Sequence, residues 1–151
     1  QAPQRKMVVA KSGPDNVEVD ETLNALERAR HFGNSKLSLQ RLVYVNELVD
    51  CAHEIGYEAT VNHLLPLVKK LASDAEVLVR QSLLGHFGDV AGFLIQADPD
   101  RGYQTVVDDL LPLVSGLLTE RQGEVRQGAA EALTTLASHL RPGERGDQVL
   151  K

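Results

Sequence analysis

The side chains with the greatest capacity for chemistry in this 151-residue chain are five histidines and one cysteine. His53 and Glu54 form an adjacent pair, but the spacing to His63 is not that of a zinc-protease motif, in which two histidines share one helical face. The histidines fall on separate predicted helices without the spacing of metal ligands: His31, His53, His63, His86 and His139. We therefore expect neither a metal site nor a bound cofactor.

Neither the cysteine nor the glycine-rich stretch of the chain forms a convincing catalytic arrangement. Cys51 has no base beside it, because His53 lies two residues further along and would point to another side of a helix. The Gly-His-Phe-Gly segment at residues 85–88 lies in the middle of the strongest predicted helix. A phosphate-binding loop would instead stand at the start of a helix. We therefore expect no catalytic residue and no enzymatic activity.

The composition argues against two classes of partner. A net charge of −5 and a pI near 5.5 do not suggest the basic stripe with which a nucleic-acid-binding protein holds phosphates. No stretch approaches the roughly 18 consecutive apolar residues of a membrane-spanning helix. A hydrophobic content of 42% nevertheless supports a real core. We expect a protein partner, and neither nucleic acid nor membrane.

Three further features bear on where the protein resides. Cys51 is the only cysteine, so it cannot form an internal disulfide, which fits a reducing compartment. The apolar run at residues 7–10 is too short for the core of a signal peptide. We predict a cytoplasmic or nuclear protein, and we interpret the start at Gln1 as a sign of a fragment, or of the ordered part of something longer.

The helices that would carry these residues can be predicted from an internal repeat in the sequence. Residues 56–94 shifted by 46 positions align with residues 102–140, and 14 of the 39 aligned positions are identical. The segment Leu-Leu-Pro-Leu-Val occurs at the same place in both copies, at 64–68 and 110–114. A repeat of this period is typical of stacked pairs of helices. It predicts an all-α fold of the α-solenoid kind.

Each copy is predicted to contain two helices, at residues 57–72 and 75–95 in one copy and 103–118 and 121–139 in the other. Apolar residues recur at helical spacing in the second helices: Val79, Leu83, Phe87, Val90 and Leu94, then Val125, Ala129, Leu133, Leu136 and Leu140. Ser73 before Glu76, and Thr119 before Gln122, form capping-box patterns that predict the helix starts. A proline inside each first helix, Pro66 and Pro112, predicts a bend at equivalent places.

The rest of the chain is predicted to add one looser helix pair and two tails. A helix opening at Val19 and ending near Phe32, and a second with Leu42, Val45 and Val49 inward, form this first pair. The prediction is six helices in three repeats at about 17–55, 56–96 and 102–140, within a solenoid over 17–140. Residues 1–16 are expected to be extended or disordered, and 141–151 to be a flexible tail.

This pairing of helices resembles the HEAT-repeat family. The residues that carry the resemblance are the internal prolines, the acidic turn residues and the arginines that follow them: Pro66, Pro112, Asp74, Glu120, Arg80 and Arg126. The resemblance implies a ladder of contacts between acidic residues and arginines of neighbouring repeats. Segments 23–28, 47–50, 64–68 and 71–74 are similar to the HEAT-repeat regulatory subunits of protein phosphatase 4 and, less specifically, to the scaffold subunit of protein phosphatase 2A.

The resemblance implies a non-catalytic scaffold that binds the catalytic subunit of a serine/threonine phosphatase. We expect the partner at the edge formed by the turns within helix pairs and by polar residues early in the second helices: Asn34, Gln40, Arg41, Asp74, Gln81, Glu120, Arg121 and Gln127. Two alternatives stay open for function, a HEAT-repeat fragment with an unrelated protein partner and, further off, a small HEAT-like enzyme. A further alternative concerns the partner surface. In it, Asp74 and Glu120 have a structural role alone, and they cap helices and pair with neighbouring arginines.

Overall fold

The computed structural model describes residues 24–142, and in this part of the chain every regular element is a helix and none is a strand. The predicted all-α class is therefore confirmed. The expected extended segment at 1–16, the helix start at Val19 and the tail beyond Pro142 lie outside the described residues.

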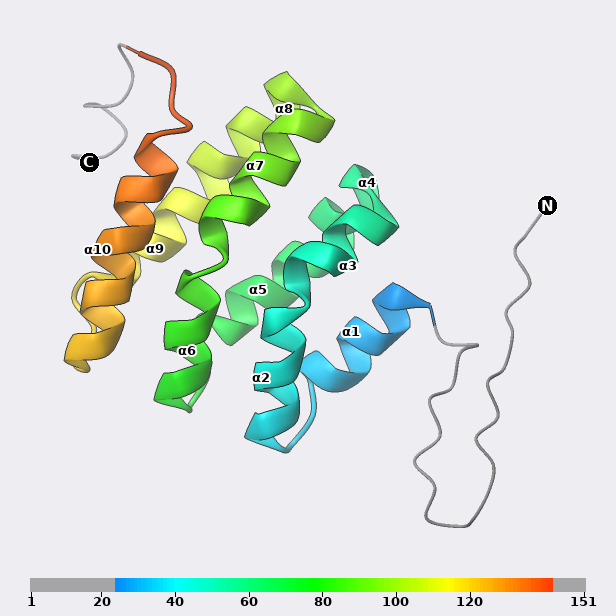
Figure 1. The fold of residues 1–151 in the computed structure, drawn as a ribbon, viewed down its shortest axis with the longest axis vertical. Helices are drawn as coiled ribbons and strands as arrows, with labels where there is room; N and C mark the ends of the chain where they lie inside the picture. The colour runs from blue at the N-terminus through cyan, green and yellow to red at the C-terminus, as the bar shows by residue number, and fades with distance from the viewer. Residues whose placement is uncertain (1–23, 143–151) are drawn as a thin grey trace.

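The described helices form antiparallel pairs that follow one another along the chain (Figure 1). The first pair consists of α1 (Ala25–Gly33) against α2 (Ser38–Asn46) and α3 (Leu48–Ile55). The second consists of α4 (Tyr57–Ala59), η1 (Thr60–Leu64) and α5 (Leu65–Leu71) against α6 (Val77–Leu84) and α7 (Phe87–Ala97). The third consists of α8 (Pro99–Thr105), η2 (Val106–Leu110) and α9 (Leu111–Leu117) against α10 (Gly123–Ala137).

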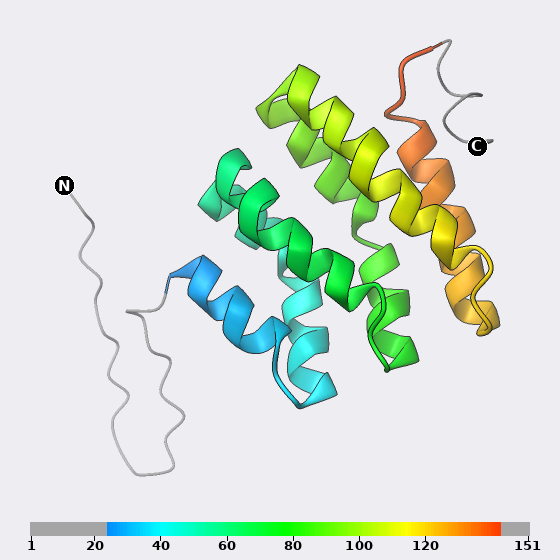
Figure 2. The ribbon, with the colours of Figure 1, turned by 180° about the vertical axis from the view of Figure 1, so that it is seen from behind.

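The pairs build two layers. The second members, α2–α3, α6–α7 and α10, lie side by side and face the viewer in Figure 1, and α6–α7 packs against both neighbours. The first members, α1, α4–η1–α5 and α8–η2–α9, form the other layer, which Figure 2 shows from its own side. Consequently the turns within the three pairs all lie at one edge of the molecule.

The core lies between these two layers. The predicted apolar stripe of the second pair is fully confirmed, since Val79, Leu83, Phe87, Val90 and Leu94 are all buried. In α10 and just after it, Val125, Ala129, Leu136 and Leu140 are buried as predicted. Leu133 is only partly buried and packs against the edge of the core. Cys51 is buried as expected for a small apolar side chain.

The internal prolines are accommodated by π-helical turns. η1 comes just before Pro66 and η2 just before Pro112. The N–H of Leu65 donates to the carbonyl of Thr60, five residues back, and that of Leu111 donates to Val106. A wider turn is a natural response here, because a proline ring lacks an N–H and crowds the carbonyl four residues before it.

Two predicted helices are interrupted. The second helix of the first pair is broken at Glu47, and the helix predicted over 75–95 is broken at Gly85 and His86. The Gly-His-Phe-Gly segment therefore does not lie in mid-helix, as predicted, but spans the junction where α7 begins. Glycine weakens a helix because its backbone is freer in the unfolded chain, which explains the second break.

The predicted capping boxes are also wrong. Glu76 and Gln122 are themselves the N-cap residues of α6 and α10, and no side chain caps either helix in the usual way. A complete capping box occurs instead at α1. Asn24 Oδ1 accepts from the N–H of Glu27 at 2.8 Å, and Glu27 Oε1 accepts from the N–H of Asn24 at 2.9 Å.

Candidate functional site

The turns within the helix pairs share one hydrogen-bonding arrangement. The side chain of the turn residue accepts from the backbone N–H two positions later, at 3.0 Å for Ser35, 2.9 Å for Asp74 and 3.3 Å for Glu120. The carbonyl of the same residue then accepts from an arginine of the following helix. This repeated set fixes the shape of the turn without a conventional N-cap.

The arginines of these turns are Arg41, Arg80 and Arg126, and we call them the clamp arginines. Their Nη1 atoms donate to the carbonyls of Ser35, Asp74 and Glu120 at 2.8, 2.7 and 2.7 Å. The clamp arginines therefore occupy equivalent positions in the three pairs. Residues at the same distance in sequence from their clamp arginine can therefore be treated as equivalent positions in the three helix pairs.

Two clamp arginines also reach the next helix pair. Arg41 binds both carboxylate oxygens of Asp74, with Nε–Oδ2 at 2.7 Å and Nη2–Oδ1 at 2.9 Å. Arg80 Nη2 lies 2.9 Å from Glu120 Oε1. These ion pairs between neighbouring helix pairs are the contacts that the family resemblance implied. Arg126 makes no ion pair with any described residue.

The ion pairs shift the titration of both acids. Burial by itself raises the pKa of Asp74, but hydrogen bonds from Arg41 and from the Glu76 N–H outweigh it, so the net pKa is lowered. The hydrogen bond from Arg80 lowers the pKa of Glu120. Both carboxylates are therefore stabilised in the ionised form by the fold.

The eight residues expected to bind a partner divide into two groups. Gln40, Arg41, Asp74 and Glu120 are partly buried. Gln40 accepts a hydrogen bond from Ser35, and the other three belong to the ion pairs between helix pairs. Asn34, Gln81, Arg121 and Gln127 are exposed. The structure brings Gln81 and Gln127 to the same cleft, while Asn34 and Arg121 stay at the turn edge.

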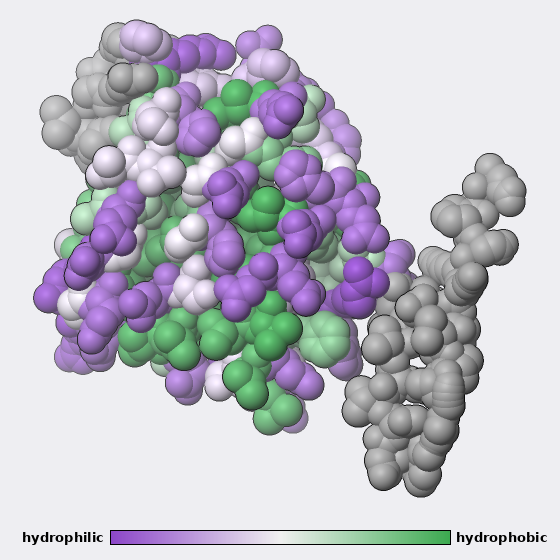
Figure 3. Space-filling view, in the orientation of Figure 1, coloured by the Kyte–Doolittle hydropathy of each residue, from purple (hydrophilic) through white to green (hydrophobic). Residues whose placement is uncertain are grey.

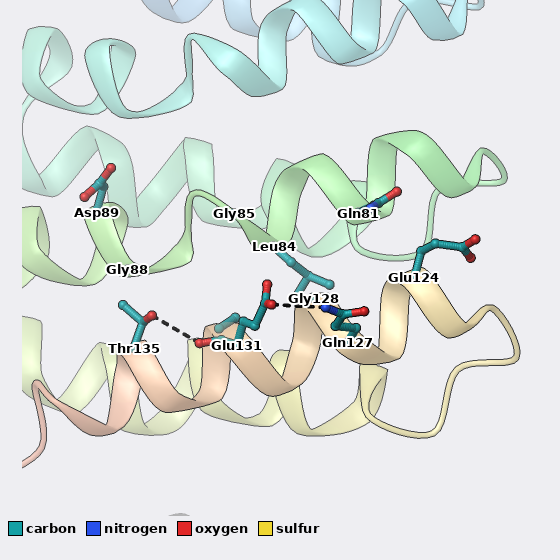
Figure 4. A pocket seen from close by; sticks show the side chains of 11 residues that line it. Gln81, Leu84, Gly85, Gly88, Asp89, Glu124, Gln127, Gly128, Glu131 and Thr135 are labelled. Atoms are coloured by element: carbon teal, nitrogen blue, oxygen red, sulfur yellow. Dashed lines mark hydrogen bonds between the residues drawn. The ribbon is translucent and has the colours of Figure 1, made fainter.

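That cleft lies between α6–α7 and α10 and has a volume of about 460 Å³. Figure 4 shows Gln81 and Asp89 on the α6–α7 side and Glu124, Gln127 and Glu131 along α10. Gln127 Nε2 donates to Glu131 Oε2 at 3.3 Å. The complete lining is Gln81, Leu84, Gly85, Gly88, Asp89, Glu124, Gln127, Gly128, Glu131, Ala132 and Thr135. We call it the acidic cleft.

The charge of the acidic cleft has one sign. Asp89, Glu124 and Glu131 line it, and no lysine or arginine among residues 24–142 does. None of the three forms an ion pair with a residue in the range 24–142. Gly88 stands at the start of α7 beside Asp89, so this helix start faces carboxylates and is a poor place for a phosphate.

The corresponding contact between α2–α3 and α6–α7 is filled by polar side chains. Asn46 Oδ1 accepts from Ser82 Oγ at 3.2 Å and lies 3.1 Å from His86 Nε2. We call this place the Asn46 junction. Counted from the clamp arginines, Asn46 corresponds to Gly85, Ser82 to Gly128, and His86 to Ala132. The acidic cleft is open where small residues replace this polar trio.

An exposed apolar patch lies beside the acidic cleft. Leu39 is 69% exposed, Leu78 is 58% exposed, and Leu37 and Val43 are exposed as well. In Figure 3 apolar surface gathers over the lower ends of α2 and α6. Large apolar side chains that cluster on a surface are typical of interaction sites. Their positions outside the core stripe were a signal in the sequence that our prediction did not use.

The histidines and the cysteine do not form a site in the described part of the chain. The ring of His53 packs on Phe93 at 4.9 Å, and His63 Nδ1 lies 3.1 Å from Arg30. No group of three potential ligands that could hold a metal occurs among residues 24–142. Cys51 Sγ contacts the carbonyl of Ala25 at 3.6 Å, and burial raises the pKa of the thiol, which disfavours a nucleophilic thiolate.

No protein-family model matches the chain, and no curated protein matches it. Among the described helices, none is long and apolar enough to cross a membrane.

Proposed function

We propose that this protein is a non-catalytic binding module built of three HEAT-like repeats, an α-solenoid in which neighbouring repeats are joined by the clamp arginines. The observation that carries the proposal is the arrangement at the turns, repeated three times with two ion pairs that link one helix pair to the next. A regular stack of this kind offers a long continuous surface to a protein partner.

We further propose that the partner is the catalytic subunit of a serine/threonine phosphatase. This part rests on the sequence resemblance to HEAT-repeat phosphatase subunits. The residues able to meet such a partner are the exposed ones at the turn edge and in the acidic cleft: Asn34, Gln81, Arg121 and Gln127. Arg41, Asp74 and Glu120 act in this proposal as parts of the scaffold, because their ion pairs are largely buried between helix pairs.

Direct binding of purified components tests this function. The full chain is mixed with the catalytic subunits of phosphatases 4 and 2A, and with a tyrosine phosphatase as a control, and binding is measured by calorimetry. We expect binding to a serine/threonine enzyme only. The Arg121→Glu variant should weaken it, because Arg121 is exposed and makes no ion pair within residues 24–142.

A matched control keeps this test specific. Arg30→Glu reverses another exposed charge, on α1 and away from the turn at Arg121, and should leave phosphatase binding unchanged. Absence of binding to either serine/threonine enzyme would reject the phosphatase partner and favour an unrelated protein partner. Turnover of a substrate by the purified chain, or stoichiometric iron or zinc in it, would instead support the enzyme alternative.

A further inference from the structure

The acidic cleft and the exposed apolar patch form one surface that phosphatase binding at the turn edge does not explain. Leu78 and Gln81 lie about one turn apart on α6, so the patch adjoins the cleft. In the register of the clamp arginines, Leu39, Leu78 and Glu124 are equivalent positions on α2, α6 and α10. The same row of the layer therefore changes from apolar to acidic as it enters the cleft.

We propose that this surface docks a short amphipathic segment of a protein partner, with a lysine or arginine side chain in the acidic cleft and apolar side chains on Leu39, Val43 and Leu78. The proposal rests on the protein-binding role but not on the identity of the partner as a phosphatase. Its basis is charge complementarity, because three carboxylates line the cleft without any basic residue among the lining side chains.

Other occupants fit these residues less well. A nucleic acid would bring phosphates against Asp89, Glu124 and Glu131, where like charges repel. A metal ion would need a set of ligands close together, and residues 24–142 contain none. The adjoining apolar patch matches a peptide that carries both kinds of side chain. Amphipathic helices that bind in grooves use their apolar residues in this manner.

The Asn46 junction also suggests which side chains would fill the cleft. The Asn46 junction fills the equivalent space with Asn46, Ser82 and His86. A Cβ added at Gly85 would meet only the Ser82 carbonyl, at the ordinary distance of 3.4 Å. Replacing Gly85 by asparagine and Ala132 by histidine therefore transfers the polar pair that closes the other junction.

The probe is a fluorescent peptide with leucines on one helical face and lysines on the other, titrated with the full 151-residue chain and followed by anisotropy. Two matched peptides replace all lysines by glutamate or all leucines by serine, and a single-stranded oligonucleotide serves as a third probe. We expect binding of the first peptide only, weakened by salt. If the serine peptide binds as tightly as the first peptide, binding is due to general charge attraction and the proposal is overturned. Binding of the glutamate peptide would overturn it as well.

Variants then locate the site. Glu131→Lys and the double change Gly85→Asn with Ala132→His should each weaken peptide binding at least about tenfold. Asp50→Lys, an exposed carboxylate on α3 outside the cleft, is the matched charge control and should change affinity little. Circular dichroism checks that each variant stays folded. Unchanged affinity in Glu131→Lys, or an equal loss in Asp50→Lys, would reject the site.

The phosphatase partner and the peptide-docking surface can be rejected independently of each other. Arg121→Glu should weaken phosphatase binding and leave the peptide affinity unchanged, because Arg121 does not line the acidic cleft. If the peptide binds as expected while no phosphatase does, the docking surface stands and the phosphatase partner is rejected. If phosphatase binds and no basic amphipathic peptide does, the docking surface is rejected.

Discussion

The Asn46 junction and the acidic cleft occur between successive helices of the same layer, yet one is filled and the other is open. At the Asn46 junction, Asn46 bridges Ser82 and His86 across the two helices. At the acidic cleft, Gly85, Gly128 and Ala132 take the equivalent positions and leave a space of about 460 Å³. The turns and the clamp arginines are shared, and the side chains at these three positions differ between the filled contact and the open one.

Two glycines allow close contact between the helices that flank the cleft. A Cβ at Gly88 would overlap the Thr135 methyl group, and one at Gly128 would lie 3.3 Å from Leu84 Cδ1. Gly88 and Gly128 thus let α10 pack tightly on α6–α7 beside the cleft. The comparison teaches that small residues at three positions can leave an open cleft between two packed helices.

The largest effect is expected at Phe87, which begins α7 between the two contacts and is 0% exposed. Phe87→Ala removes a fully buried ring and should lower the free energy of unfolding by about 3–5 kcal/mol. Leu133→Ala, by contrast, should cost less than about 2 kcal/mol, because Leu133 is only partly buried. Urea unfolding of both variants measures this, and equal losses would contradict the burial that distinguishes them.

The ion pairs that cross the two contacts provide the next comparison. The Asp74 side chain is 7% exposed and accepts from Arg41 twice, whereas Glu120 is 19% exposed and accepts from Arg80 once. Asp74→Ala should therefore destabilise by about 1–3 kcal/mol, because it leaves Arg41 without its partner. Glu120→Ala should cost less, and the opposite order in urea unfolding would contradict this account.

The ion pair of Asp74 with Arg41 should also make the stability of the protein depend on pH. The pKa of Asp74 is lowered in the folded chain, so its contribution to stability is complete above the unfolded value of about 3.9 and is lost as the pH falls through the lower folded value. The unfolding midpoint in urea should therefore be constant above about pH 5 and should drop progressively as the pH falls further. In Asp74→Asn, which cannot titrate, this drop should be smaller.

Much of the helical core could be predicted from the sequence, because burial of an apolar stripe follows helical periodicity. The break at Gly85 had a visible signal in the glycine, although the strong stripe around it favoured a continuous helix. The break at Glu47 had only a weak signal in Asn46, a poor helix former, and the apolar stripe continues past it. The break becomes clear only once the helices are packed.

The residues of the candidate site were harder to predict, because their contacts depend on how separate helices pack together. Arg41 was predicted to face a partner because it is a polar residue near the start of a second helix and lies outside the apolar stripe. Its ion pair with Asp74 joins residues 33 positions apart and depends on how two helix pairs stack. The acidic cleft likewise arises from Gly85 facing α10, a relation between helices that periodicity within one helix does not encode.

A smaller effect is expected from opening the Asn46 junction. Asn46→Ala removes the acceptor shared by Ser82 and His86, and should lower stability by about 0.5–1.5 kcal/mol. The low end is favoured, because both donors are partly exposed and can bind water instead. Thermal unfolding measures the change. A loss as large as that of Asp74→Ala would mean that the polar trio holds the helices together as strongly as the ion pair does.

The smallest effect is expected within the acidic cleft itself, at Gly85. Its φ of −68° is open to any residue, and a Cβ there meets only the Ser82 carbonyl at 3.4 Å. Gly85→Ala should therefore raise the free energy of unfolding by about 0.5 kcal/mol, because alanine has less backbone freedom to lose on folding. Gly88→Ala is the matched contrast, since its Cβ would overlap Thr135, and it should destabilise by about 1 kcal/mol. Precise urea curves distinguish opposite signs at this scale. If both alanines stabilise the chain, then α10 can move away from α7 at little cost, and tight packing at Gly88 does not set the width of the acidic cleft.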